Sequence, residues 1–188
     1  MQNLKDHLAK TLKDLRKDRG WSLDAAAAAT GVSKAMLGQI ERGESSPTTA
    51  VLWKLATGFQ VSVSSLMEPL PELAAETLIR DAGTIRNIPG DKGMAVAPLF
   101  PFEARFGFDL MELTFLPGYE RLSEPHEAGV IEHVTVISGT MEICTEGEWH
   151  PLTAGQSIRF RGDRPHGYRN RNEEKAVTLS VIHYPHRA

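Results

Sequence analysis

The spacing of apolar residues changes once along this 188-residue chain, at a short proline-containing segment. Before it, leucines recur every three or four residues, as at Leu4, Leu8, Leu12 and Leu15, which is the period of an amphipathic helix. After it, short runs rich in Val, Ile, Phe and Thr are separated by Gly or Pro turns. The pattern therefore predicts a helical domain followed by an antiparallel β-sandwich or barrel. The five expected strands cover residues 106–115, 130–137, 140–145, 157–160 and 176–184.

The boundary between the two parts lies at Glu68-Pro69-Leu70-Pro71-Glu72, where the helical pattern fails. We therefore expect a first domain over residues 1–67, a linker over 68–76 and a second domain over 77–188. Charge is distributed unevenly between them. The first 67 residues hold nine Lys/Arg against six Asp/Glu, and the remaining residues hold twelve against eighteen. A function that requires binding to a polyanion would therefore belong to the first part.

Capping residues divide the first part into five short helices. Serines stand at the expected N-caps and glycines at the expected ends. The caps are Ser22, Ser33 and Ser46, and the breaks are Gly20, Gly31, Gly43 and Gly58. Pro47 after Ser46 suits the first position of the fourth helix. The third helix is expected over residues 34–42 and the fifth over 63–67.

The second and third helices have the features of a DNA-reading pair. The alanines of residues 25–29 allow another helix to cross closely, and Gly31-Val32 forms a tight turn between the two. The chain here resembles the phage-repressor-like (xenobiotic-response-element type, XRE) helix-turn-helix regulators over roughly residues 6–67. The resemblance rests on Trp21-Ser22-Leu23, Thr30-Gly31-Val32-Ser33, Gln39-Ile40-Glu41-Arg42-Gly43 and Ser46-Pro47.

That resemblance implies that residues 34–39 form a recognition face that enters the major groove. The Gln39 amide could pair bidentately with adenine, and Lys34 could contact a guanine or a phosphate. Hydroxyl groups near the start of the fourth helix suit a phosphate oxygen. The expected DNA contacts are Ser33, Lys34, Ala35, Met36, Gln39, Ser45, Ser46, Thr48 and Thr49. By the same resemblance, Arg16 and Glu41 form an internal ion pair. The alternative is a helical bundle that serves only as a core or contacts protein.

Two histidine-containing clusters mark the second part. The first cluster begins at Pro117-Gly118, continues through His126-Glu127-Ala128-Gly129-Val130-Ile131-Glu132-His133-Val134 and ends at Gly139. The second begins at Gly155, continues through Phe160 and ends with Asp163-Arg164-Pro165-His166-Gly167-Tyr168-Arg169-Asn170. In order and spacing they resemble the two motifs of the cupin barrel, over roughly residues 100–185. The expected fold class is therefore an α plus all-β two-domain chain, with a five-helix helix-turn-helix bundle followed by an antiparallel cupin (jelly-roll) barrel.

Three residues of these clusters could hold a metal ion. Metal-binding cupins use two histidines and a glutamate from the first motif and a histidine from the second. His126, Glu132 and His166 match three of these positions, and Ala128 stands where the other histidine would be. If one strand ran unbroken here, alternation would place His126, Ala128 and Glu132 on its inward face and His133 on the other. Two imidazoles and a carboxylate suit zinc or iron. The alternative is a degenerate site whose residues hydrogen-bond an organic effector or one another.

A DNA-reading domain joined to a small-molecule barrel predicts a ligand-responsive bacterial transcription factor. Residues 31–48 also resemble the cupin-bearing regulators of sulfur utilisation, which implies a sulfur-containing amino acid, cysteine or methionine, as effector. Arg121 and Tyr168 are candidate effector-binding residues. The alternative is a cupin metalloenzyme of dioxygenase or isomerase type that carries a DNA-binding domain. The absence of the second histidine and of an evident acid/base pair weakens that alternative.

The thin positive charge of the first domain predicts that one copy contacts too few phosphates for useful affinity. We therefore expect a homodimer on an inverted repeat of double-stranded DNA.

No run of about 18 apolar residues exists, and the charged residues 1–17 lack the apolar core of a signal peptide. We therefore expect a cytoplasmic protein with no membrane partner. The single cysteine, Cys144, excludes an internal disulfide and a cysteine-only metal cluster.

Overall fold

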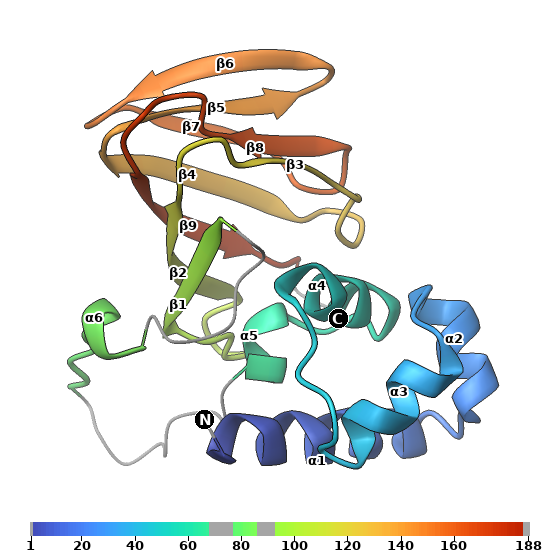
Figure 1. Cartoon of the computed structure of the whole chain (residues 1–188). Helices are drawn as coiled ribbons and strands as arrows, with labels where there is room; N and C mark the ends of the chain where they lie inside the picture. The colour runs from blue at the N-terminus through green and yellow to red at the C-terminus, as the bar shows by residue number, and fades with distance from the viewer. Residues whose placement is uncertain (1, 68–76, 86–92, 186–188) are drawn as a thin grey trace. The chain divides into compact units, whose positions relative to one another are not determined.

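The computed structural model describes residues 2–67, 77–85 and 93–185 (Figure 1). The chain divides into two compact units, Met1–Glu76 and Thr77–Ala188, which we describe separately. The predicted linker, residues 68–76, lies outside the described residues. Within the described ranges, no helix is long and apolar enough to cross a membrane.

The first unit contains the five expected helices. They are α1 (Gln2–Asp18), α2 (Leu23–Thr30), α3 (Lys34–Glu41), α4 (Thr49–Gly58) and α5 (Val63–Met67). The Ser22 and Ser33 side chains cap α2 and α3 by accepting hydrogen bonds from the backbone N–H groups of Ala25 and Met36, as predicted. Gly31 ends α2 with a φ of 66°, a left-handed conformation that favours glycine.

The predicted start of the fourth helix is wrong by two residues. Helix α4 begins at Thr49, and Thr48 rather than Ser46 caps it by accepting a hydrogen bond from Val51 N–H. Pro47 is buried outside the helix instead of occupying its first position. Thr48 has the extended backbone of an N-cap, and its hydroxyl satisfies one of the free N–H groups in the first turn of α4.

Apolar side chains from several helices meet in the core of the first unit. Leu12, Ile40, Leu55, Phe59 and Leu66 are all 1% exposed or less. At the edge of this core, Arg16 binds Glu41 through two hydrogen bonds of 2.6 and 2.7 Å. This ion pair joins α1 to α3, as the resemblance implied.

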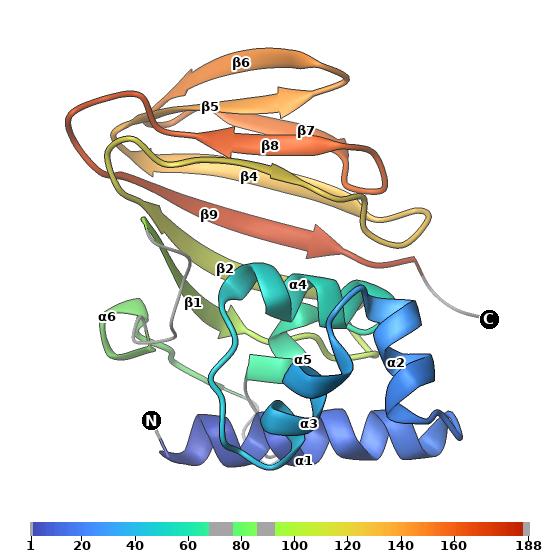
Figure 2. The same cartoon turned by 45° about the vertical axis from the view of Figure 1, so that its right-hand side comes forward.

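The described residues of the second unit form nine strands in two antiparallel sheets. They are β1 (Met94–Phe100), β2 (Phe108–Phe115), β3 (Glu120–Ser123), β4 (Ile131–Ser138), β5 (Thr140–Thr145), β6 (Glu148–Thr153), β7 (Ser157–Arg161), β8 (His166–Arg169) and β9 (Ala176–His183). One sheet has the order β1-β2-β9-β4-β7 and the other β3-β8-β5-β6. Figure 2 shows the two sheets as layers. A sixth helix, α6 (Ala82–Ile85), precedes them and was not expected.

The described strands form two facing antiparallel sheets, as expected of a sandwich or jelly roll, and these sheets do not close into one hydrogen-bonded barrel. No hydrogen-bonded ladder joins one sheet to the other among them, because the chain passes between the layers in loops such as residues 124–130. Met111, Val134, Val136 and Ile143 are fully buried and fill the space between the layers. This core supports the inner face of β4, from which the candidate site is built.

Candidate functional site

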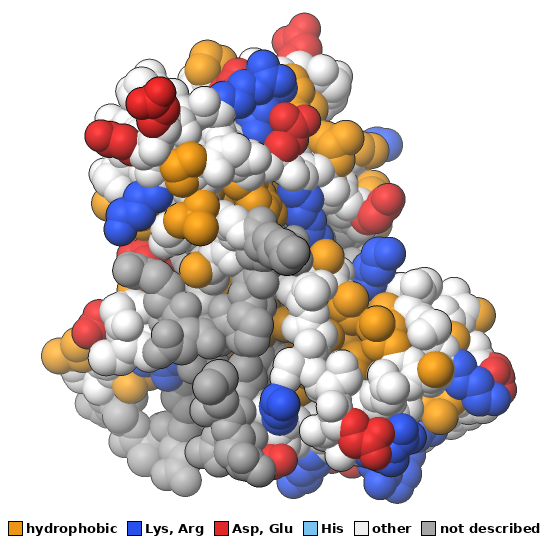
Figure 3. Space-filling model, in the orientation of Figure 1, with side chains coloured by type: hydrophobic (Ala, Val, Ile, Leu, Met, Phe, Trp, Pro, Cys, Tyr) orange, Lys and Arg blue, Asp and Glu red, His pale blue; other side chains and the backbone are white. Residues whose placement is uncertain are grey.

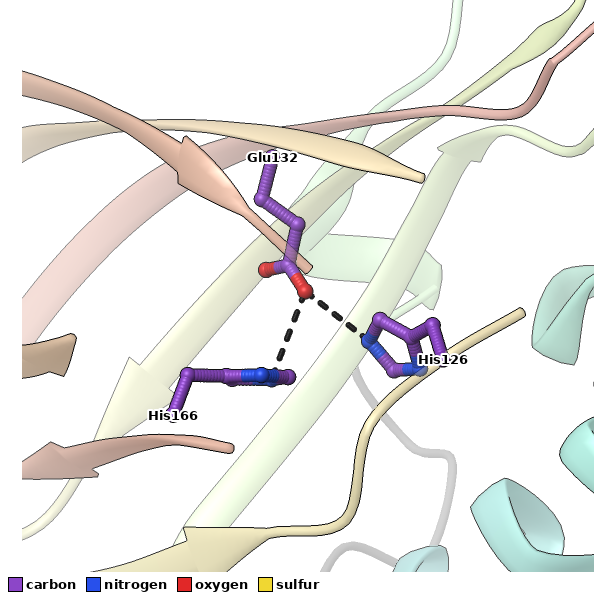
Figure 4. A group of neighbouring side chains, drawn as sticks. All are labelled: His126, Glu132 and His166. Carbon is purple, nitrogen blue, oxygen red and sulfur yellow. Dashed lines mark ion pairs between the residues drawn. The ribbon is translucent and has the colours of Figure 1, made fainter. Parts of the chain in front are cut away.

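Three predicted metal-ligating residues lie together at the inner face of the β-unit (Figure 4). Glu132 extends from β4, His166 stands at the start of β8, and His126 lies in the loop between β3 and β4. Glu132 Oε1 is 2.8 Å from His126 Nε2 and 3.4 Å from His166 Nε2. One ligand atom from each residue lies within 4.8 Å of the others, so the three side chains could share one ion.

His126 reaches the cluster from a loop, not from the continuous strand that alternation assumed. The turn between β7 and β8 holds this loop, because His126 N–H donates to Gly162 O at 2.9 Å and Gly162 N–H donates to Val130 O at 2.9 Å. Gly129 N–H adds a bond of 2.8 Å to Asp163 Oδ2. The loop is therefore fixed at three points.

Ala128 does not line the site. It is exposed in the turn before β4, which begins only at Ile131. The expectation that Ala128 shares an inward face with Glu132 is therefore wrong, because strand alternation does not extend through a turn. His133 is exposed on the opposite face of β4, as predicted.

Glu132 is 2% exposed, and its two carboxylate oxygens have different surroundings. The Tyr168 hydroxyl on β8 donates a hydrogen bond to Oε2. Oε1 accepts no hydrogen bond of normal geometry from any described residue, although the two imidazole Nε2 atoms face it. A buried oxygen without a hydrogen-bond donor is costly unless another electropositive group approaches it.

The environment keeps Glu132 ionised. Burial by itself would raise its pKa, but the close contact and charge of His126, the charge of His166 and the Tyr168 hydrogen bond lower it to about 2. Burial lowers the pKa of His166, an effect that the Glu132 charge only partly opposes. His166 Nδ1 lies 2.8 Å from Arg164 O, so Nδ1 carries the proton in the neutral ring and the Nε2 lone pair faces Glu132.

This donor set fits a divalent cation. It offers a buried carboxylate oxygen with no hydrogen-bond donor among the described residues and two imidazole nitrogens beside it. The Arg164 carbonyl binds the His166 ring, and the Tyr168 hydroxyl binds the Glu132 carboxylate. Hydrogen bonds of this kind fix the orientation of the ligand residues in protein metal sites.

The two predicted effector residues lie beside this cluster. Tyr168 is 8% exposed, and its ring stacks on Phe115 with centroids 5.7 Å apart. Arg121 is half-buried on β3 directly opposite Tyr168, and its charge acts on both His166 and Tyr168. Gly162 was not singled out from the sequence, although it lies within the second cluster, directly before Asp163. A Cβ at Gly162 would lie 3.0 Å from Glu132 Oε1 and 3.1 Å from His126 Cδ2.

The first unit presents the predicted recognition residues to solvent. Ser33, Lys34, Ala35, Met36 and Gln39 are exposed on α3, whereas Leu37 and Ile40 are buried. Lys34 makes an exposed ion pair of 2.8 Å with Asp24. On the face shown in Figure 3, basic and acidic side chains are interspersed, so no large positive patch covers it.

The residues expected at the second DNA contact differ in exposure. Ser46 and Thr48 are exposed, and Ser45 is half-buried. Thr49 is fully buried at the start of α4. This burial contradicts the expectation that Thr49 contacts a phosphate, because its side chain packs inside the unit.

Comparison with known proteins agrees with both parts of the fold. The helix-turn-helix family matches residues 12–66, and the cupin domain family matches residues 111–182. Over 185 residues the chain is 46% identical to the HTH-type transcriptional regulator SutR of Escherichia coli (strain K12), covering 98% of this chain and 99% of that protein. The chain belongs to the helix-turn-helix transcriptional regulators with a C-terminal cupin domain.

Two further transcriptional regulators show how far the likeness extends. The crystal structure of an HTH_3 family transcriptional regulator from Vibrio cholerae is 46% identical, with a TM-score of 0.82 and 97% of each chain covered. The HTH-type transcriptional regulator PuuR of E. coli (strain K12) is 26% identical over 165 residues, or 86% of each protein. The relatives named here are regulators, which supports the transcription-factor interpretation over the metalloenzyme alternative.

Proposed function

We propose that this regulator reads operator DNA with α3 and binds a small-molecule effector at the buried cluster of the cupin unit. The observation that carries the proposal is the buried Glu132 carboxylate, whose Oε1 faces the Nε2 atoms of His126 and His166 at 2.8 and 3.4 Å, in a chain that also presents an exposed recognition helix.

The proposed DNA contacts are the exposed residues of α3 and of the segment before α4. Gln39 would read a base edge, and Lys34 would contact a guanine or a phosphate once released from Asp24. The remaining proposed contacts are Ser33, Ala35, Met36, Ser45, Ser46 and Thr48.

The regulator would act as a homodimer. Lys34 and Arg42 both have acidic partners, Asp24 and Glu44, so the net positive potential of one copy is small. Two copies would read half-sites about 34–36 Å apart on an inverted repeat. Binding to a full repeat should therefore be much tighter than binding to one half-site.

We further propose that His126 Nε2, Glu132 Oε1 and His166 Nε2 hold one zinc or iron ion. When bound, the ion would supply open coordination positions for donor atoms of the effector. The protein groups have separate tasks. Glu132 provides the negative charge, the neutral His166 provides a lone pair, and the Gly162 carbonyl holds the His126 loop in place.

The effector that we propose is a sulfur-containing amino acid, cysteine or methionine. The support is the resemblance of residues 31–48 to regulators of sulfur utilisation, together with the apolar inner face of the unit. Val134 and Val136 are fully buried on the same face of β4 as Glu132. Such a lining suits a thioether or thiol better than a charged side chain.

Calorimetry of the full chain tests the site directly. Titration of the zinc-loaded protein with cysteine and with methionine should show binding by at least one of them. The metal-free His126→Ala/His166→Ala protein should not bind either amino acid. Undiminished binding by this double variant would exclude the metal cluster as the effector site. His133→Ala is the matched control, because His133 is an exposed histidine beside Glu132.

A further inference from the structure

The five-stranded sheet carries a hollow on the face opposite the core. The hollow has a volume of about 480 Å³ and is open to solvent. It lies over three neighbouring strands, β7, β4 and β9. Its lining residues are Ile131, His133, Arg159, Phe160, Arg161 and His183. The regulatory function described above makes no use of it.

The lining is basic in a unit that is otherwise rich in acidic residues. Four of the six lining residues are Arg or His and none is acidic, whereas residues 68–188 hold twelve Lys/Arg against eighteen Asp/Glu. His133 stands directly opposite Arg159 across the β4–β7 ladder. Placing basic side chains opposite one another does not stabilise a sheet. A bound anion would make the arrangement favourable.

The two arginines have different partners. Arg161 binds Asp163 through two hydrogen bonds of 2.9 and 2.8 Å, and the charge of Glu146 also acts on it. Within residues 2–67, 77–85 and 93–185, the exposed side chain of Arg159 makes no hydrogen bond or ion pair. Its guanidinium is therefore available to an external acceptor.

We propose that this hollow binds a small molecule that carries an oxyanion group such as phosphate or sulfate. Arg159 would be the principal contact, because a guanidinium pairs bidentately with an oxyanion. His133, which stands opposite Arg159 and also lines the hollow, would donate a further hydrogen bond. Ile131, which stands between Arg161 and His183 across the three strands, provides an apolar surface. The volume lies in the range of small-molecule sites and exceeds that of a bare oxyanion.

Nuclear magnetic resonance of the labelled full chain tests the proposal. The protein is titrated with inorganic phosphate and with phenyl phosphate, with sodium chloride added to hold the ionic strength constant. We expect saturable shifts of the backbone amides of His133 and Arg159. Tighter binding of phenyl phosphate would identify an organic molecule as the ligand class. Equal or weaker binding would identify the free oxyanion.

Two arginine variants distinguish a specific anion-binding site from a general effect of positive surface charge. Arg159→Ala should weaken binding at least tenfold. The matched control is Arg171→Ala, because Arg171 is also exposed but lies 4.0 Å from Glu120 near the other sheet. Its removal should change the affinity less than twofold. If Arg159→Ala lowers the melting temperature, His133→Asn serves as a second variant, and we expect it to weaken phosphate binding by the same factor.

Two results would overturn the proposal. The first is the absence of saturable shifts with either phosphate compound at constant ionic strength. The second is an equal loss of binding in Arg159→Ala and Arg171→Ala. Either result would mean that these charges only keep the exposed edge strand β7 from pairing with other chains.

Discussion

Tyr168 and Glu132 are joined across the two sheets by a hydrogen bond from the Tyr168 hydroxyl to Glu132 Oε2. Because Oε2 is occupied, the other carboxylate oxygen, Oε1, is the one that faces His126 and His166. Tyr168 thus sets the orientation of the carboxylate and of the donor set as a whole. Tyr168 was predicted to contact the effector, and in the structure its hydroxyl also binds the buried carboxylate of Glu132.

Removing the Tyr168 hydroxyl should weaken metal binding without unfolding the cupin unit. We expect Tyr168→Phe to lower zinc affinity about 10–100-fold, as the loss of an outer hydrogen bond does in other metal sites. The matched control is Tyr184→Phe, which removes a hydroxyl that donates to Asp109 Oδ2 at 2.9 Å. Competition with a zinc-binding dye measures both variants. Equal affinities of the two variants would show that Tyr168 does not orient Glu132.

The metal-free protein should lose stability as the pH falls below about 6.5. Burial lowers the folded-state pKa of His166, so the unfolded chain binds the proton first and acid favours unfolding. Glu132 adds a second loss between pH 4.5 and about 2, because its folded-state pKa is depressed. Melting temperatures at pH 7.5 and 5.5 in the presence of a chelator measure the first effect.

Two histidine variants test whether His166 causes this pH dependence of the melting temperature. The difference in melting temperature between the two pH values should shrink in His166→Gln. It should persist in His133→Gln, because His133 is exposed. If both variants keep the full difference, the acid sensitivity arises elsewhere in the chain.

The Arg16–Glu41 ion pair should be important for the stability of the helical unit. Its side chains are 16% and 8% exposed, so Arg16→Ala leaves a largely buried carboxylate without its partner. We expect a loss of about 3 kcal/mol in the free energy of unfolding, measured by urea denaturation. Arg42→Ala breaks the exposed pair with Glu44 and should cost far less, because solvent screens that pair. Similar costs for the two variants would contradict this account of the pair.

Two substitutions on the helical unit distinguish base reading from phosphate attraction. Gln39→Ala should cost about 1–3 kcal/mol on the operator and relax specificity at one position. Asp24→Asn removes the acidic partner of Lys34 and should tighten binding to all sequences alike. Fluorescence anisotropy on the operator and on single-base variants measures both. If Gln39→Ala discriminates between the operator and its single-base variants as well as the wild type does, Gln39 does not belong to the proposed interface.

Local patterns predicted those features that depend on neighbouring residues. Ser22 and Ser33 cap their helices because an N-cap needs only the next turn of chain. The strand over residues 140–145 was predicted with the observed ends. Strand β1 was missed because Pro98 interrupts its pattern, and a proline is tolerated there only because β1 is an edge strand.

The parts of the site that were missed depend on long-range pairing. Alternation predicted Glu132 correctly inside β4, but it could not show that the chain turns at Ala128. His126 reaches the cluster through hydrogen bonds to Gly162, which is 36 residues away along the chain. The hydrogen bond between Tyr168 and Glu132 likewise forms because their strands belong to two sheets that face each other, which a local sequence pattern does not reveal.

The most direct test of the account measures operator affinity with and without effector. The protein first selects its operator from genomic fragments, and anisotropy is then recorded with zinc-loaded full chain, with cysteine or methionine present or absent. The account predicts that at least one amino acid changes the wild-type dissociation constant fivefold or more. His166→Ala should bind the same operator with unchanged affinity and show no response. An unchanged wild-type affinity with both amino acids, or an equal response in His166→Ala, would contradict the account.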